Sequence, residues 1–319
     1  MHLHLRIFIP MKEQRIFGKT GLRVSPLGFG GAPIGYLAAE QQQVTRILNL
    51  LLDAGVNVID TAECYPGSEP LIGQAVGHRR KEFVLVTKCG HQAEGLSGAE
   101  WSPQLITQTV DRSLTRLRTD HLDVVLLHSG AMSVLQRGDA LAALAKARAA
   151  GKIRFLGYSG DNEEAAFAAG LPEVDVIETS VNICDQSNLD SVLPKARERN
   201  LGVLAKRPIA NAAWKSAQRG IYTEYAQPYA QRLRAMGLTP HDLGFQGDPD
   251  SAWPEIALRF TLAQPGVHVA ITGTTDPDNA RKNLAIAERG PLPAAAVTRI
   301  RGAFRAACKG TSTQWPGLT

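Results

Sequence analysis

With 319 residues, 44% of them hydrophobic and 20% charged, the chain has the composition of a soluble globular protein. It contains no run of about eighteen or more apolar residues, which argues against a membrane-spanning helix. The net charge of +5 is spread along the chain without a basic stripe, so we expect a small anionic ligand rather than a nucleic acid.

The N-terminus does not read as a secretory signal, because Met1–Pro10 lacks a long apolar stretch and a small-residue cleavage site. We expect residues 1–13 to be disordered or an extension ahead of one domain, residues 14–319. The cysteines are widely spaced and form no CxxC pair, which argues against a zinc site and a disulfide scaffold. They are Cys64, Cys89, Cys184 and Cys308. We therefore expect no metal and a cytoplasmic location.

Short apolar segments rich in Val, Ile and Leu alternate with helical segments, as in a parallel sheet covered on both faces. After a predicted hairpin (Gln14–Pro26), the expected strands are Leu27–Gly30, Val58–Asp60, Phe83–Thr87, Leu122–Leu127, Ile153–Gly157, Val174–Thr179, Gly202–Ala205 and Val267–Ile271. The expected helices are Gln41–Ala54, Pro70–Val76, Pro103–Leu117, Asp139–Ala150, Glu163–Ala169, Asp190–Arg199, Pro254–Ala263, Pro277–Ala287 and Ala294–Cys308.

Eight such repeats predict an α/β fold of the closed (β/α)8 TIM-barrel type. The alternative, an open doubly wound sheet, would need a glycine-rich phosphate loop after the first strand, and the GFGGAP segment at Gly28–Pro33 is not one. A long loop is expected after the seventh strand, from Arg207 to Trp253. Its aromatic residues could line a substrate pocket or simply pack together; they are Trp214, Tyr222, Tyr225 and Tyr229.

Ionisable residues follow three successive predicted strands. Asp60 ends the second strand, with Tyr65 in the next loop, Lys88 ends the third and His128 the fourth. In a barrel these positions meet at one rim. A phenol whose pKa is lowered by an ammonium group could give a proton to a carbonyl oxygen as hydride arrives, while an aspartate holds the ammonium and a histidine orients the substrate.

Each of these residues has a simpler reading when taken alone. Asp60 could cap a helix, Lys88 could be a solvated strand end, and Tyr65 or His128 could be packed side chains. The four together, in this order and at strand ends, favour catalysis. Cys64 and Cys89 adjoin Tyr65 and Lys88, which admits a redox switch, although Cys89 should point toward the helices because adjacent strand residues face opposite ways.

Six segments together resemble the aldo-keto reductase family, over about Gln14 to Ile286. They are FGKTGLRVSPLGFGG, GVNVIDTAECYPGSEPLIGQAV, VLVTKCG, VVLLHSG, AGKIRFLGYSG and ITGTTDPDNARKN. The resemblance implies a TIM barrel, an extended NAD(P)(H) across the rim, hydride transfer and no metal. It also implies that Tyr65 is the general acid/base, that Lys88 and Asp60 tune it, and that His128 orients the substrate.

The resemblance further implies where the cofactor binds. The segment after the eighth strand would receive the adenosine phosphate through Gly273, Thr274, Thr275, Asn279 and Asn283. NADP(H) is the expected cofactor, with NAD(H) as the alternative, because Thr275 stands where a cation commonly pairs with the 2′-phosphate. Lys206 and Arg207, in place of the usual Ser-Pro, could contact phosphate, and Gly31 is assigned to the same set.

For the nicotinamide carboxamide, the family pattern has Ser-Asn after the fifth strand and Gln on the sixth. Here Ser159 matches, but Gly160 follows it and Glu178 replaces the glutamine. Glu178 could accept a hydrogen bond from the carboxamide but could not donate one.

The sequence therefore predicts an NAD(P)(H)-dependent oxidoreductase acting on a small aldehyde, ketone or sugar carbonyl, or on the corresponding alcohol. One alternative is a catalytically silent dinucleotide-binding regulatory protein on the same barrel. Another is an isomerase or aldolase that uses Lys88 as a Schiff-base nucleophile. Neither a nucleic-acid nor a membrane partner is expected, and the sequence leaves the oligomeric state open.

Overall fold

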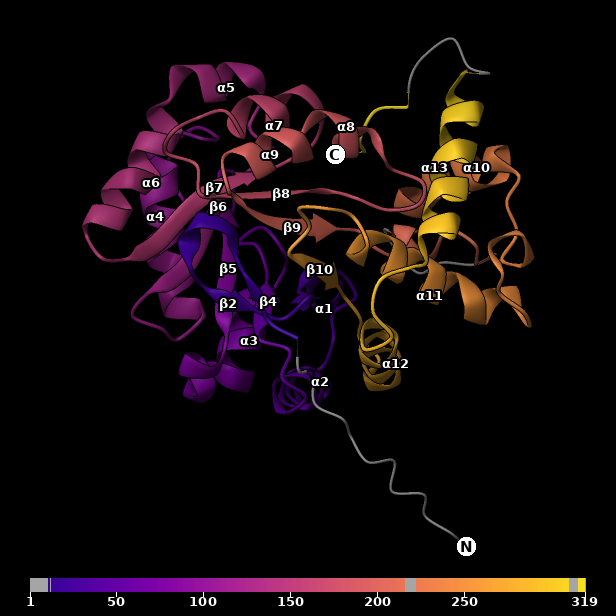
Figure 1. Cartoon of the computed structure of the whole chain (residues 1–319). Coiled ribbons are helices and arrows are strands. Elements are labelled where there is room, and N and C mark those ends of the chain that lie inside the picture. The colour runs from indigo at the N-terminus through magenta and orange to yellow at the C-terminus, as the bar shows by residue number, and fades with distance from the viewer. Residues whose placement is uncertain (1–10, 12, 216–221, 310–314, 319) are drawn as a thin grey trace, which may run out of the picture.

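The barrel predicted from the sequence is present in the computed structural model, which describes residues 11, 13–215, 222–309 and 315–318. All its strands are parallel and form a closed ring in the order β10-β3-β4-β5-β6-β7-β8-β9 (Figure 1). The barrel strands are β3 (Leu27–Gly30), β4 (Val58–Asp60), β5 (Val84–Cys89), β6 (Leu122–His128), β7 (Ile153–Ser159), β8 (Val176–Ser180), β9 (Gly202–Lys206) and β10 (Val269–Thr272). They lie within two residues of the predicted ranges.

A short hairpin, β1 (Arg15–Ile16) and β2 (Arg23–Val24), closes the end of the barrel where the strands begin. Phe17, between its strands, is fully buried, and a Cβ on Gly202 would lie only 2.9 Å from its ring. The predicted hairpin is thus confirmed and plugs this end of the barrel. Of the predicted N-terminal extension, Met11 is buried and its amide donates to the carbonyl of Ala54 at 2.7 Å, whereas residues 1–10 and 12 lie outside the described residues.

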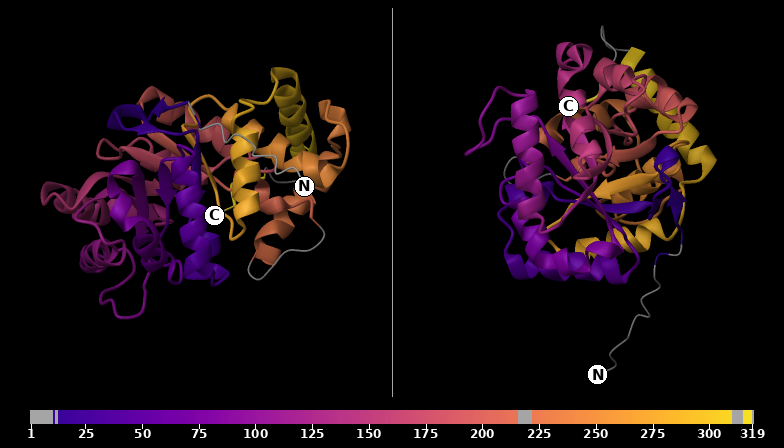
Figure 2. Two further views of the ribbon diagram at one scale, coloured as in Figure 1. Left: turned by 90° about the horizontal axis from the view of Figure 1, so that it is seen from below. Right: turned by 90° about the vertical axis from the view of Figure 1, so that its left-hand side faces the viewer.

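Helices surround the strands (Figure 2). They are α1 (Ala32–Tyr36), α2 (Gln41–Asp53), α3 (Ser68–Val76), α4 (Pro103–Arg116), α5 (Met132–Arg137), α6 (Asp139–Ala149), α7 (Asn162–Ala168), α8 (Ser187–Ser191), α9 (Leu193–Glu198), α10 (Tyr222–Met236), α11 (Pro249–Leu262), α12 (Pro277–Ala287) and α13 (Ala294–Lys309). The 3-10 turns are η1 (Gly18–Thr20), η2 (Gly77–Glu82), η3 (Ala210–Ala212) and η4 (His241–Leu243). No helix in the described part of the chain is long and apolar enough to cross a membrane.

The interval after the seventh barrel strand is more ordered than the sequence suggested. It contains α10, despite Pro228 inside that helix, and α10 packs beside α13. The next helix, α11, begins at Pro249 rather than at the predicted Pro254, because the Asp248 side chain caps it by accepting a hydrogen bond from the Ser251 amide at 3.0 Å.

Alternation along the strands divides the buried core into two layers. Val84 and Val86 of β5 belong to a small cluster inside the barrel, which also holds Phe17, whereas Leu85 and Cys89 pack outward among the helices. The same alternation continues to the end of each strand. Any residue two positions beyond an inward-facing valine or leucine therefore faces the inside of the rim.

Candidate active site

The inward positions at the strand ends carry the polar residues of the site. Four polar residues each lie two positions after an apolar residue of the cluster inside the barrel. They are Asp60 after Val58, Lys88 after Val86, His128 after Leu126 and Glu178 after Val176. The register aligns His128 with Ser159, and Ser159 with Glu178. The fold thus gathers side chains from residues 60 to 178 into one ring.

Lys88 lies at the centre of this ring, and its side chain is fully buried. Its Nζ is 2.5 Å from Asp60 Oδ1 and 3.2 Å from Glu178 Oε2, and it donates to the carbonyl of Thr61 at 3.0 Å. Burial alone would lower the pKa of Lys88, but Asp60 and Glu178 together raise it above its usual value. Burial, and then the charge of Glu178, raise the pKa of Asp60 against the opposing effect of Lys88. The lysine therefore stays an ammonium ion.

Tyr65 lies beside this ion pair. The Lys88 Nζ is 5.5 Å from the centre of the tyrosine ring, and the Tyr65 and His128 rings are 6.0 Å apart with nearly perpendicular planes. The expectation of a lowered phenol pKa is wrong for this structure. Lys88 does lower the pKa of Tyr65, but burial raises it further, so the net shift is upward and the phenol keeps its proton at neutral pH.

His128 is held at both its main chain and its ring. Its carbonyl accepts a hydrogen bond from Trp101 Nε1 at 2.9 Å, and its Nδ1 lies 3.5 Å from Cys64 Sγ. Burial, and then the nearby Lys88 and His91, lower the pKa of His128 well below its usual range. The imidazole is therefore neutral and carries one N–H.

Other aromatic side chains near the site were not predicted from the sequence. The His91 ring lies 4.9 Å from that of His128 and 5.3 Å from that of Trp101. The Tyr36 ring, 41% exposed, lies 5.6 Å from that of Tyr65. Their places in sequence, just after β5 and β3, put His91 and Tyr36 on the rim.

Of the residues assigned to the cofactor, Ser159 and Glu178 join the ring directly. The Ser159 hydroxyl donates to Glu178 Oε1 at 3.2 Å. Glu178 Oε2 is buried and, among the described residues, has no hydrogen-bond partner of good geometry, although it lies near Lys88. A buried acceptor without a hydrogen bond fits the amide of a nicotinamide carboxamide, which would supply the missing donor.

Lys206 and Arg207 lie on the same rim but already make contacts within the chain. Lys206 Nζ is 3.0 Å from Asp161 Oδ2, and Arg207 donates to the carbonyl of Leu318 and lies over the Tyr225 ring at 5.5 Å. Arg207 also has a φ of 56°, a left-handed conformation that is rare for a residue with a side chain. Such strained backbone is common near functional sites.

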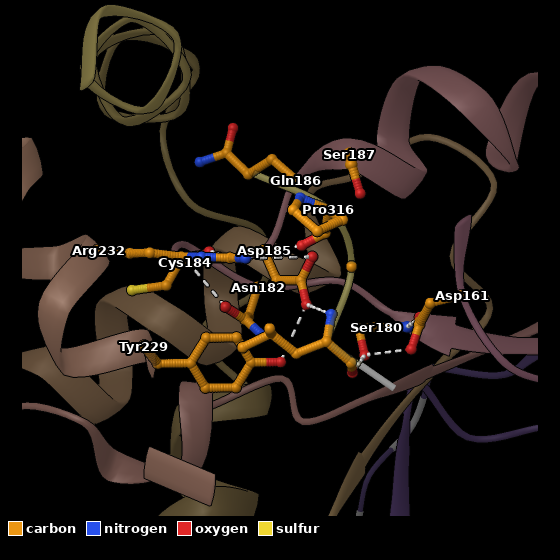
Figure 3. Close-up of polar contacts among 12 residues, drawn as sticks. Asp161, Ser180, Asn182, Cys184, Asp185, Gln186, Ser187, Tyr229, Arg232 and Pro316 are labelled. Carbon is orange, nitrogen blue, oxygen red and sulfur yellow. Dashed lines mark hydrogen bonds and ion pairs between the residues drawn. The ribbon is translucent and has the colours of Figure 1, made fainter. Parts of the chain in front are cut away.

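The C-terminal segment Trp315–Leu318 packs against this part of the rim. Gly317 exchanges two hydrogen bonds with the Asn162 side chain, at 2.6 and 3.0 Å, and the Leu318 amide donates to Asp185 Oδ2 at 3.0 Å. Arg232 donates to the carbonyl of Pro316 at 2.8 Å. Figure 3 shows the hydrogen bonds from Tyr229 to Asp185 and from Ser180 to Asp161 beside this segment.

The other predicted cofactor residues lie where β10 ends and α12 begins. Gly273 packs so closely on the end of β3 and the first turn of α1 that a Cβ would lie 2.6 Å from the carbonyl oxygen of Gly30 and from the Pro33 ring. Thr274 bonds the main chain of Asp276, which caps α12, while Thr275 is partly exposed, Asn279 exposed and Asn283 buried. Gly31 is explained by packing, because its amide donates to Asp60, its carbonyl accepts from Ser68, and a Cβ would lie 2.7 Å from Ser68 Oγ.

The cysteines beside the site are poorly suited to a redox switch. Cys89 is buried on the outward side of β5, as expected, and burial raises its pKa. Burial also raises the pKa of Cys64 to about 11. Both thiols therefore stay protonated at neutral pH and are weak nucleophiles.

Of the aromatic residues that follow the seventh strand, some pack in the interior and one lies on the rim. Trp214 stacks on Trp253 with ring centres 6.2 Å apart, and Tyr229 is fully buried. Tyr225 is exposed beside Arg207. The side chain of Tyr222 lies outside the described part of the chain.

Comparison with known proteins agrees with this geometry. The sequence profile of the Aldo/keto reductase family matches residues 26–304. The uncharacterized oxidoreductase YqkF of Bacillus subtilis is 28% identical over 85% of this chain and 90% of its own length. The L-galactose dehydrogenase of Arabidopsis thaliana is 26% identical over 86% and 87%.

A solved structure from Pseudomonas aeruginosa, described as an aldo-keto reductase, superposes with a TM-score of 0.70 at 27% identity, covering 89% of this chain and 98% of the other. The family profile spans most of this chain, and the barrel agrees with it. The chain therefore belongs to the aldo/keto reductase family of oxidoreductases.

Proposed function

We propose that this enzyme interconverts an alcohol and a small aldehyde, ketone or sugar carbonyl with a nicotinamide dinucleotide. The observation that carries the proposal is the buried ion pair of Lys88 and Asp60 beside Tyr65, with neutral His128 facing the tyrosine ring. These four residues supply a proton donor, its electrostatic support and a hydrogen-bond donor at one point. The sugar-like substrate is supported by the name of the Arabidopsis relative, L-galactose dehydrogenase.

A bound nicotinamide supplies a hydride to the carbonyl carbon, or accepts one from the alcohol. Tyr65 gives its phenolic proton to the carbonyl oxygen in reduction, and in oxidation its phenolate form takes the alcohol proton. The Lys88 ammonium stabilises the phenolate that reduction leaves, and Asp60 holds Lys88 in place. His128 donates its N–H to the substrate oxygen and so places it near Tyr65.

The residues that we propose for cofactor binding lie on the same rim of the barrel. Ser159 and Glu178 would hold the carboxamide, and the segment Gly273–Asn283 would receive the adenosine end at the start of α12. NADP(H) is the cofactor we propose, with NAD(H) as the alternative, because Thr275 brings no charge to a 2′-phosphate. We place the enzyme in the cytoplasm, where thiols such as Cys64 and Cys89 stay reduced.

The Schiff-base alternative fits the site less well. An amine must lose its proton to attack a carbonyl, but Lys88 is held as an ammonium ion by two carboxylates. A silent binding protein would keep dinucleotide affinity and show no turnover, so binding and turnover have to be measured separately.

The test is a fluorescence titration with NADPH and NADH, followed by turnover at 340 nm on a panel of aldehydes and sugars. Tyr65→Phe should lower kcat by roughly 10²- to 10⁴-fold, because the proton donor is lost, while the Kd for the dinucleotide stays nearly constant. Turnover close to wild type in this variant would reject Tyr65 as the acid. Failure of the wild-type protein to bind either dinucleotide would reject the proposed function.

A further inference from the structure

Glu178 links the catalytic lysine to the expected carboxamide position. It is 2% exposed, receives a hydrogen bond from Ser159 at Oε1 and lies 3.2 Å from Lys88 Nζ at Oε2. The resemblance to the family predicts an uncharged glutamine at this position. The carboxylate is therefore a departure that places an added charge at the centre of the site.

Glu178 and a second carboxyl group share one buried ammonium. Lys88 is the one buried ammonium between two carboxylates, and Asp60 lies closer to it, at 2.5 Å. On the adjoining strand β9, Lys206 is paired with Asp161 at 3.0 Å, and Arg207 is directed to the Leu318 carbonyl. His128 and Tyr65 are neutral, and burial together with the charge of Glu178 raises the pKa of Asp60, so the Glu178 carboxylate is the negative group that faces Lys88 from the expected carboxamide side.

The two forms of a nicotinamide differ by one charge, since the oxidised ring is a cation and the reduced ring is neutral. A carboxylate at the carboxamide attracts the cation more than the neutral ring, and the low dielectric of a buried site strengthens this difference. Glutamine in the same place would make the same hydrogen bond without the charge.

We propose that Glu178 stabilises the oxidised cofactor relative to the reduced one and so shifts the bound equilibrium toward alcohol oxidation. This inference rests on the proposed function, because it requires that a nicotinamide dinucleotide binds at Ser159 and Glu178. Glu178 would thus influence the direction of the reaction, which a hydrogen bond to the carboxamide alone would not do.

The experiment compares wild type with Glu178→Gln by titrating each protein separately with NADP⁺, NADPH, NAD⁺ and NADH at pH 7. The ratio of the Kd of the oxidised form to that of the reduced form should rise on the order of tenfold in the variant, because one unit charge is lost at close range. Glu163→Gln makes the same chemical change at an exposed position of α7 and should leave the ratio unchanged.

The outcomes separate the two proposals. A Kd ratio that is unchanged in Glu178→Gln would overturn the charge role. This includes the case in which both affinities fall equally, since that result leaves only a hydrogen bond. Absence of binding to wild type would instead overturn the proposed function. If Glu178→Gln fails to fold, Ser159→Ala provides the second test, because it removes the hydroxyl that donates to Glu178 and keeps the carboxylate. An unchanged Kd ratio in that variant would support the charge role, and a rise on the order of tenfold would overturn it.

Discussion

Cys64 and His128 meet at a contact that bears on which imidazole nitrogen carries the hydrogen. The thiol stays protonated, with its pKa raised by burial to about 11, and its sulfur lies 3.5 Å from Nδ1. Donation from S–H to Nδ1 requires the histidine hydrogen to be on Nε2. The substrate would then meet a hydrogen-bond donor rather than an acceptor.

Cys64→Ala should therefore weaken catalysis by roughly threefold to tenfold, because the weak hydrogen bond that fixes the tautomer is lost. Cys64→Ser replaces the thiol with a better donor and should stay close to wild type. Steady-state kinetics with one aldehyde would measure both variants. Equal losses in the two variants would show that the volume of the sulfur matters, and that its hydrogen bond does not.

The positions of the proposed catalytic residues at the rim could be predicted from the sequence, because the inner face of each strand is fixed by alternation. Asp60, Lys88 and His128 each lie two residues after a buried apolar residue that faces inward. The roles of Glu178 in the ion-pair ring and of Cys64 beside His128 could not be predicted, because both depend on distances between different strands. The direction of the pKa shift of Tyr65 was also missed, since it depends on how deeply the ring is buried.

Among the elements, the C-terminal segment Trp315–Leu318 makes contacts that no local pattern encodes. Its partners Asn162, Asp185 and Arg207 are more than a hundred residues away in sequence. The helix α10 was missed for a different reason. A long loop was predicted for the whole interval from Arg207 to Trp253, but the structure has a helix there that contains Pro228 and packs against α13.

Gly317 allows a direct test of the docked segment. It is buried, and a Cβ there would lie 2.8 Å from Cβ of Asp161 and 3.0 Å from Asn188 Nδ2. Gly317→Ala should displace the segment, destabilise the protein by about 1–3 kcal/mol and weaken dinucleotide binding, because Arg207 loses the Leu318 carbonyl that holds it.

Gly302→Ala is the matched control, since Gly302 is exposed on α13 and a Cβ there meets nothing within 4 Å. Chemical denaturation and dinucleotide titration would compare the two variants. If Gly317→Ala behaves like Gly302→Ala in both measurements, the docked segment contributes neither to stability nor to binding.

For the whole molecule, stability should depend on pH through carboxyl groups buried in the fold. Burial raises the pKa of Glu69 to about 7 from its usual 4.5, although Thr87 donates to it at 2.8 Å. Its protonated form is favoured in the folded state. The stability it contributes is therefore complete below pH 4.5 and is lost as pH rises toward 7.

Glu69→Gln should remove that loss. Relative to wild type, the variant should be more stable at pH 8 by up to about 3 kcal/mol and nearly equal at pH 4.5. Urea denaturation at the two pH values would measure the difference, with exposed Glu163→Gln as the control. A difference between Glu69→Gln and wild type that does not change with pH would contradict the assignment.

The ring is closed by β10 and β3, whose paired residues Ala270 and Leu27 are far apart in the chain. During synthesis, a ribosome must therefore deliver almost the whole barrel before the last strand can pair. Until then, β3 and β9 would each present an unpaired edge, the kind of surface on which chains join one another. A transcript or mutation that stops translation before Val269 would thus yield an open sheet with unpaired edge strands instead of a smaller enzyme. We expect such fragments to aggregate or to be bound by chaperones.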